Sequence, residues 1–178
     1  MDAVTINIKQ DSIRSAAMLS VLVLFFVLML DPSCPAQQLG IRSRDKSQLV
    51  IHDLIHNDQI FSEVQWDIHN SFQNQGVAVV WTAGPFQISS GSRSDTKLAD
   101  TGLSIRIQNS GPKNAWKLAQ ALDVTNVAKG DNSAMVSAVS NQHSEATFGI
   151  TVLFRNNATT IPAAGRYETL LIGTITSL

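Results

Sequence analysis

The stretch of sequence that decides the fold reads Thr147-Phe148-Gly149-Ile150-Thr151-Val152-Leu153-Phe154. Its bulky apolar residues Phe148, Ile150, Val152 and Phe154 occupy every second position. Successive side chains of a β-strand point to opposite faces of the sheet, so these four would share one face. The period of two therefore predicts a β-strand with that face in a hydrophobic core.

Strands of the same kind are predicted on both sides of this stretch. Residues 60–68 alternate, and Ile60, Val64, Trp66 and Ile68 are expected to face the core. Further strands are predicted at 76–82, 103–107, 116–118, 134–139 and 167–175. Gly, Asn, Ser and Pro gather between them at 84–85, 89–95, 109–112, 129–133 and 155–157, as turns and loops require. About seven or eight short strands with this spacing predict an all-β fold, an Ig-like or Greek-key β-sandwich of antiparallel strands.

Two segments leave the choice between helix and strand open. Residues 48–55 place Leu49, Val50, Leu54 and Ile55 where either element would bury them, and residues 119–122 fit a short helix as well as a strand. The chain shows no internal repeat and no long linker. We therefore expect one sandwich domain over residues 48–178, preceded by a flexible polar segment at 37–47.

The first 36 residues have the pattern of a secretory leader. Lys9 and Arg14 precede an apolar run over residues 16–30. A membrane-spanning helix needs about 20 apolar residues, and this run is shorter. Asp31-Pro32 ends the run, and the small residues at 33–36 suit a signal peptidase. The pattern predicts a signal peptide over residues 1–36, cleaved after Ala36, and an extracytoplasmic protein that is secreted, periplasmic or on the cell surface.

Two other fates of the leader remain open at this point, an uncleaved anchor and a lipid attached to Cys34. Cys34 is the one cysteine in the chain. Cleavage after Ala36 would leave a mature chain without disulfides and without a membrane span. Stability would then come from the core alone, which a domain of this length can supply.

The charge of the mature chain excludes one class of partner. The sequence holds 13 Lys and Arg and 14 Asp and Glu, and without the leader 11 of each remain. The net charge is then zero, with no basic stripe along any predicted strand. Nucleic acid is therefore not an expected partner, because its binding requires a concentration of positive charge.

The residues that could carry chemistry do not form a recognised motif. His52 and His56 have the spacing of two metal ligands, but no third ligand is fixed by the sequence, and His69 and His143 stand apart. We therefore predict no metal site and no cofactor. The chain has no Gly-x-Ser-x-Gly elbow and no phosphate-binding glycine loop.

Carboxylates and tryptophans are the remaining candidates. Glu63, Asp67, Asp123 and Glu145 could supply the two acids of a glycosidase, but most occupy the polar positions of alternating strands, which favours a solvated face. We predict no catalytic residue among them. The tryptophans, Trp66, Trp81 and Trp116, could form a platform for a sugar, but their apolar neighbours favour the core.

The C-terminal region resembles secreted bacterial surface domains. Residues 160–167, Thr-Ile-Pro-Ala-Ala-Gly-Arg-Tyr, followed by an alternating run, are similar to the entry into the last strand of fimbrial (pilin-type) subunits and of WxL cell-surface domains. Gly165 has the position of the pilin glycine fourteen residues from the C-terminus, whereas Ser177 stands where pilins have a penultimate Tyr. The resemblance implies polymerisation, in which the N-terminal arm of a neighbour, here residues 37–47, completes the sandwich by strand addition.

Taken with the leader, this resemblance implies an exported, non-enzymatic structural or adhesive surface protein of fimbrial-subunit type. Its partners would be further copies of the chain or other surface subunits, bound through sheet edges. The alternative is a secreted ligand-binding module of carbohydrate-binding type, which requires exposed aromatic side chains beside polar ones.

Overall fold

A computed structural model of the chain describes residues 2–11, 38–52, 58–72, 75–88, 98–156 and 166–178. These residues form thirteen β-strands and one short 3-10 turn. The strands are β1 (Asp2–Asp11), β2 (Leu39–Ser43), β3 (Ser47–His52), β4 (Asp58–Ile60), β5 (Val64–Asn70), β6 (Val77–Ala83), β7 (Phe86–Ile88), β8 (Leu98–Ser110), β9 (Trp116–Gln120), β10 (Leu122–Val124), β11 (Ala134–Ser140), β12 (Ser144–Arg155) and β13 (Tyr167–Ser177). The turn is η1 (Val127–Lys129).

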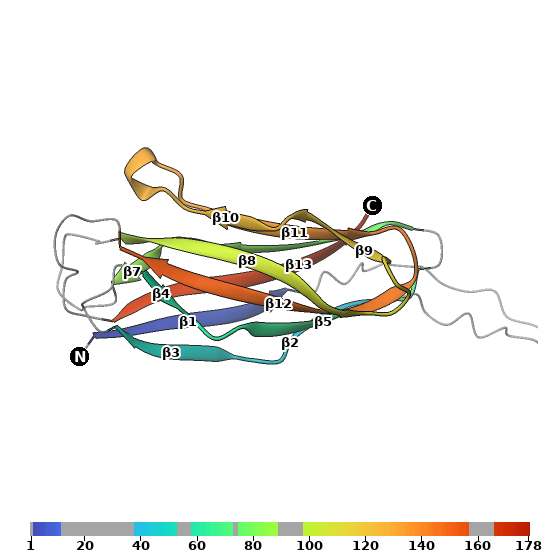
Figure 1. Cartoon of the computed structure of the whole chain (residues 1–178), viewed down its shortest axis with the longest axis horizontal. Helices are drawn as coiled ribbons and strands as arrows, with labels where there is room; N and C mark the ends of the chain where they lie inside the picture. The colour runs from blue at the N-terminus through green and yellow to red at the C-terminus, as the bar shows by residue number, and fades with distance from the viewer. Residues whose placement is uncertain (1, 12–37, 53–57, 73–74, 89–97, 157–165) are drawn as a thin grey trace, which may run out of the picture.

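The strands form two layers that pack face to face (Figure 1). Sheet A, as we name it, has the order β3-β1-β13-β6-β11-β9. Sheet B has the order β2-β5-β12-β8-β10, and β4 pairs with the end of β12. The short β7 pairs with both β13 and β8 and so joins the layers at one end. Most hydrogen-bonded neighbours are not consecutive along the chain, which is the connectivity of β-sandwiches.

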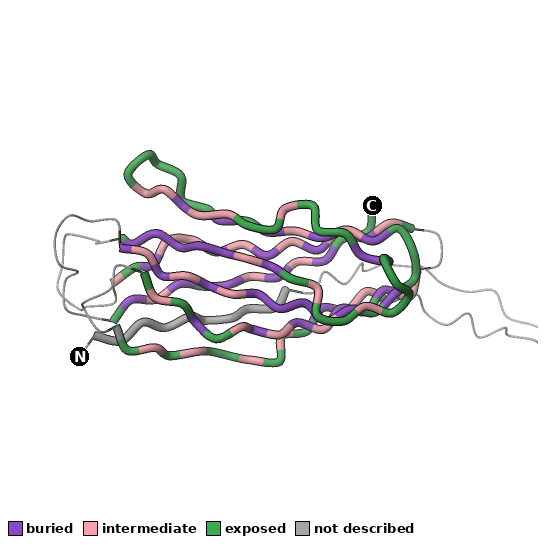
Figure 2. Tube along the Cα trace, viewed as in Figure 1, coloured by how far each residue is buried: buried purple, intermediate pink, exposed green. Residues whose placement is uncertain are grey.

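The prediction of an all-β sandwich is confirmed, with more strands than the seven or eight expected. The core lies between the two sheets, where the inward half of each alternating strand is buried (Figure 2). Phe148, Ile150, Val152 and Phe154 are all buried, as the deciding stretch predicts. The additional strands include β1 and β2, which were expected to be a leader and a flexible segment, and the short β4, β7 and β10, which contain too few residues to show a period.

Aromatic rings tie the two sheets together in this core. Phe148 on β12 lies 5.2 Å from Trp81 on β6 and 5.3 Å from Trp116 on β9, measured between ring centroids. Trp66 on β5 meets Trp81 edge-on at 6.2 Å. Because these pairs cross from one sheet to the other, they fix the spacing of the layers as well as burying apolar area.

Several local expectations are corrected by the structure. The alternating segment 60–68 is broken between β4 and β5, so Ile60 is 68% exposed and Phe61 is buried in its place. The helical alternatives are wrong where the structure describes them, because residues 48–52 belong to β3 and residues 119–120 to β9. Residues 53–57 lie outside the described part, as do the loop at 89–95 and Gly165.

The segment 37–47, expected to be flexible, contains β2 and the first residue of β3. β2 pairs along its whole length with β5, from Leu39 opposite Asn70 to Ser43 opposite Trp66. Ile41 is buried in the core of its own domain. This segment is therefore a strand of the sandwich to which it is attached, and it would have to leave that sheet to complete a neighbour.

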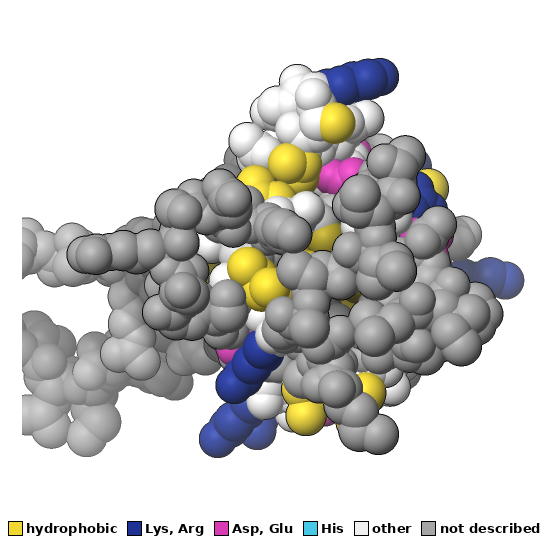
Figure 3. Space-filling model, turned by 90° about the vertical axis from the view of Figure 1, so that its left-hand side faces the viewer, with side chains coloured by type: hydrophobic (Ala, Val, Ile, Leu, Met, Phe, Trp, Pro, Cys, Tyr) yellow, Lys and Arg dark blue, Asp and Glu magenta, His cyan; other side chains and the backbone are white. Residues whose placement is uncertain are grey.

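One loop stands clear of the sandwich. The connection from β10 through η1 to β11 projects beyond the two layers (Figure 1). Figure 3 views this end of the molecule and shows a basic side chain extending from the loop. Gly130 takes a left-handed conformation with φ 80° directly after η1, a conformation that glycine adopts without strain. The turn predicted at 129–133 is confirmed. Among the described residues, no helix has the length and apolar character needed to cross a membrane.

Candidate functional site

The strand β1 covers the edge of β13 that β6 leaves unpaired. β1 lies between β13 and β3 in sheet A (Figure 1). It runs parallel to β13 and pairs with eight of its residues, from Val4 opposite Tyr167 to Asp11 opposite Thr174. On its other side it runs antiparallel to β3, from Asp2 opposite His52 to Asn7 opposite Ser47. β1 is thus the hydrogen-bonding partner of the β13 edge that faces away from β6.

The position of β13 is fixed by the core beneath it. Gly173, near the middle of the strand, lies so close to the core that a β-carbon there would stand 2.7 Å from the Trp66 ring and 2.9 Å from Ile41. These distances are shorter than any ordinary contact, so only glycine lets β13 approach the Trp66 ring this closely. The edge that β1 covers therefore belongs to a strand that is packed directly against the core.

The strand on the far side of β1 has an apolar outer surface. Leu49 and Ile51 of β3 are 63% and 55% exposed, whereas Val50 between them packs against the core. Exposed apolar side chains on the edge strand of a sheet favour contact with another chain.

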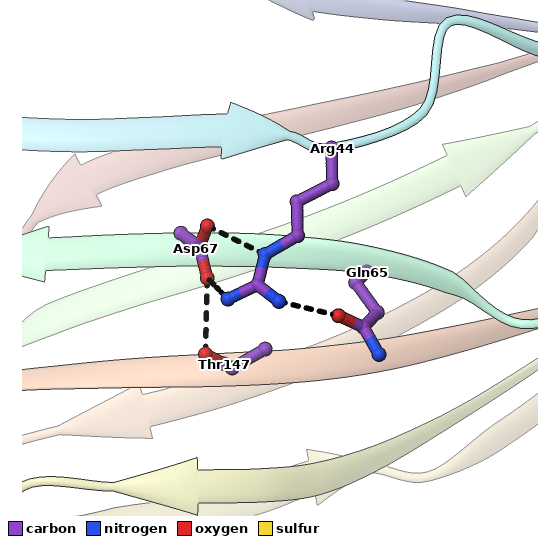
Figure 4. Close-up of polar contacts among 4 residues, drawn as sticks. All are labelled: Arg44, Gln65, Asp67 and Thr147. Atoms are coloured by element: carbon purple, nitrogen blue, oxygen red, sulfur yellow. Dashed lines mark hydrogen bonds and ion pairs between the residues drawn. The ribbon is translucent and has the colours of Figure 1, made fainter.

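Sheet B has a polar outer face with an ordered network at its centre. The Arg44 guanidinium donates to both carboxylate oxygens of Asp67, from Nε at 2.8 Å and Nη2 at 2.7 Å, and from Nη1 to Gln65 Oε1 at 2.6 Å (Figure 4). Thr147 Oγ1 donates to Asp67 at 3.0 Å. The hydrogen bonds from Arg44 lower the pKa of Asp67 below its ordinary value, against the opposite effect of partial burial.

A second network crosses the same face. Glu63 lies over Gly149, where a side chain would collide with its carboxylate, and accepts hydrogen bonds from Arg106 and Gln108. The hydrogen bond from Arg106 is the largest cause of the lowered pKa of Glu63, and partial burial opposes it. Gly149 therefore provides the space in which this ion pair lies flat across β12.

The predicted acids do not assemble a pair suited to general acid catalysis. A general acid needs a raised pKa, and the pKa values of Glu63 and Asp67 are lowered by arginines. Asp123 uses its two carboxylate oxygens to accept from the backbone N–H groups of Val124 and Met135. Glu145 accepts instead from His69, with Nδ1 2.8 Å from Oε1.

The structure describes the side chains of two of the four histidines, His69 and His143. His69 and His143 meet edge-on with ring centroids 6.4 Å apart. His52 is the last residue of β3, with a side chain that is not described, and His56 lies outside the described part. Among the described residues, no three His, Cys, Asp or Glu side chains come together as a metal would require.

The tryptophans pack in the core, as the sequence favours. Trp66 and Trp81 are fully buried and Trp116 is almost so. They therefore offer no platform to a sugar, which removes the basis on which the carbohydrate-binding alternative rested.

The sequence reasoning missed that residues 2–11, expected to belong to a leader, form a strand of the fold. Val4-Thr5-Ile6-Asn7-Ile8 alternates in the same way as the other strands, but its place before an apolar run favours the interpretation as the start of a signal peptide. Arg42 and Arg44 likewise fall in a segment predicted to be flexible. Both sets of residues are visible in the sequence, but the character of the residues around them favoured another interpretation.

Comparisons with protein-family models, with curated proteins and with solved structures gave no match to this chain, so its function is inferred from its own geometry.

Proposed function

We propose that this chain is an exported, non-enzymatic structural or adhesive surface protein, similar to a fimbrial subunit, that associates through the edge of its C-terminal strand. One observation supports the proposal above the others, which is the place of β1. This strand belongs to the 36 residues expected to be removed on export, and it covers one edge of β13 from Tyr167 to Thr174.

Cleavage after Ala36 would take β1 away and open the sheet. β13 would keep β6 on one side and lose its hydrogen-bonding partner on the other, and β3 would lose its partner as well. The freed N–H and C=O groups of β13 would then form a ready template for a strand from another chain.

The sequence of β13 supports association because it lacks the usual protection of an edge. Natural edge strands carry Lys, Pro or inward charges that prevent pairing with another chain. β13 carries one charged residue, Glu168 near its start, and from Thr169 to Leu178 the chain has no charged residue and no proline. An edge of this kind needs an occupant, and in a protein without its leader that occupant would be a strand of a neighbouring subunit.

The association is tested by comparing the full chain with residues 37–178. We expect the shorter chain to form concentration-dependent oligomers by sedimentation velocity and fibres by electron microscopy. A synthetic peptide of residues 2–11, added in excess, should bind in the place of β1 and return the protein to monomer. The matched control is the same peptide with Ile6→Pro, which removes one N–H donor and disfavours the extended ladder.

The opposite result is equally clear. If β3 moves across to pair directly with β13, residues 37–178 will remain monomeric at high concentration and will not bind the peptide. That outcome would refute association through this edge. Export is tested separately by N-terminal sequencing of the protein recovered outside the cytoplasm, which should begin at Gln37.

A further inference from the structure

The outer face of sheet B contains a groove that the proposed association does not use. Its volume is about 680 Å³, within the range of ligand-binding clefts. The walls come from β2, β5 and β12 and from the end of β8, with Arg42, Asp67, His69, Asn109 and Glu145 among the lining residues. No residue of β1 or β13 lines it, so the groove is separate from the β13 edge.

Hydrogen bonds between strands hold the walls in place before any ligand arrives. Arg44 is fixed on Asp67 and Gln65, and Asp67 also accepts from Thr147 (Figure 4). His69 is fixed on Glu145. Side chains that are already ordered lose little conformational freedom on binding, which favours affinity.

A β-bulge shapes one end of the groove. Thr147 of β12 pairs with Asn109 of β8, but Phe148 pairs with Ile107, so Gln108 is an extra residue in β8. Bulges redirect the strand and often lie beside binding sites. Beyond the bulge at Gln108, the Gly111 N–H donates to the carbonyl of Glu145 at 2.8 Å. This hydrogen bond holds residues 109–111 against the groove.

Several lining groups are left over for a ligand. The side chains of Arg42, Asn109 and Ser110 make no hydrogen bond with the described residues. His69 uses Nδ1 alone in its contact with Glu145, so its Nε2 is also available within the described part. The unused groups are therefore a guanidinium and an amide that donate, a hydroxyl that does both, and imidazole and carboxylate atoms that accept.

The charges in the groove balance. Arg42 and Arg44 lie toward β2, and Asp67 and Glu145 lie on β5 and β12. A small anion would use only the donors and would be repelled by the two carboxylates. A ligand with several hydroxyls, each of which both donates and accepts, matches donors on one wall and acceptors on the other.

From this arrangement we infer that the groove is a binding site for a neutral oligosaccharide. Arg42, Asn109 and Ser110 would hydrogen-bond its hydroxyl groups, and the half-exposed His69 ring would lie against a sugar face. The buried tryptophans do not line this site, so sugar binding here would not depend on an aromatic platform.

The experiment uses the full chain, labelled with ¹⁵N, titrated with maltotriose, cellotriose and triacetylchitotriose, and with galacturonic acid as a charged sugar. We expect at least one neutral trisaccharide to bind saturably, with amide shifts concentrated at residues 40–44, 109–111 and 145–147. Arg42→Gln should weaken that binding about tenfold or more, because hydrogen bonds to a charged group are lost. Its melting temperature should stay unchanged, because Arg42 holds no described residue in place.

The matched control is Lys117→Gln, which removes an exposed charge on β9 of the other sheet and should leave the affinity as in the native protein. The inference fails if none of the three neutral sugars binds, if the shifts map to another surface, or if Arg42→Gln binds as tightly as the native chain. Saturable binding of galacturonic acid in preference to the neutral sugars would also overturn it, since that would identify an anion site.

Discussion

The two outer faces of the sandwich are built from the same alternation and differ in what fills the outward positions. On sheet B these positions hold charged and hydrogen-bonding residues joined across strands, such as the Arg44–Asp67 and Arg106–Glu63 pairs. On sheet A the corresponding positions of β6, β11 and β13 carry one charge, Glu168 near the start of β13. The uncharged ones include Ala78, Val80, Thr82, Met135, Ser137, Val139, Leu170, Ile172 and Thr174. One face is therefore suited to water or a polar ligand, and the other to packing against an apolar surface.

This difference shows that the alternating pattern of a strand determines the residue type only at the positions that face the core. The inward residues of both sheets are alike, since both bury aromatic and aliphatic side chains. The outward residues are free of the core and can be selected for another purpose. Three predictions test this division, starting with the one that should have the largest effect.

The first prediction concerns the contact between the sheets. Gly173→Ala should lower the free energy of unfolding by about 1–3 kcal/mol, because the new β-carbon meets the Trp66 ring in a packed core. The control is Gly40→Ala on sheet B, where a β-carbon would lie 3.5 Å from His69 Cβ, an ordinary contact. Urea unfolding should show a much smaller change for Gly40→Ala. Equal effects of the two variants would contradict the close approach of β13 to Trp66.

The second prediction concerns the polar face and its dependence on pH. Glu63 and Asp67 have pKa values below their ordinary 4.5 and 3.8, so their contribution to stability is complete above those values and is lost as the pH falls below them. We expect the native protein to lose about 1 kcal/mol between pH 5 and pH 3 through these two groups, after allowance for solvent screening.

The double variant Glu63→Gln, Asp67→Asn should be less stable than the native protein at pH 5 and should change less on acidification. Urea unfolding at the two pH values measures both effects. A variant with the same pH dependence as the native protein would show that the arginine pairs on sheet B contribute nothing.

The third prediction has the smallest effect on stability and concerns the apolar face. Leu170→Lys changes an outward, 39% exposed residue of β13, and the free energy of unfolding should change by less than about 0.5 kcal/mol. Self-association of residues 37–178 should nevertheless weaken, because the new charge stands beside the open edge. The control is Thr151→Lys on the outer face of sheet B, which should leave sedimentation unchanged. Equal association of both variants would remove sheet A as the associating surface.

The sequence predicted the core strands well and the edges poorly, for one physical reason. Strands such as β12 and β13 are long, and each carries its full period within its own residues. The edge strand β2 and the strand β1, which lies next to the edge strand β3, were missed because their polar or apolar neighbours in the sequence decided the interpretation of Leu39–Ser43 and Asp2–Asp11. A strand as short as Asp58–Ile60 contains too few residues to show a period at all.

The candidate sites were less predictable than the fold, because they depend on register. Arg44, Asp67 and Thr147 come from three strands far apart in the sequence, and their meeting follows from pairings that periodicity does not specify. The burial of the tryptophans was predictable, since each has apolar neighbours at alternate positions. The bulge at Gln108 left no recognisable signal in the sequence.

The parallel pairing of β1 with β13 has a consequence for the order in which the chain folds. The two strands are more than 150 residues apart in the sequence, so β1 cannot dock until β13 has been synthesised. Contacts between such distant residues also carry the greatest loop-closure entropy and tend to form late. The remaining strands must therefore collapse around a vacant position first, and whichever strand arrives there soonest, from this chain or from another, completes the sheet.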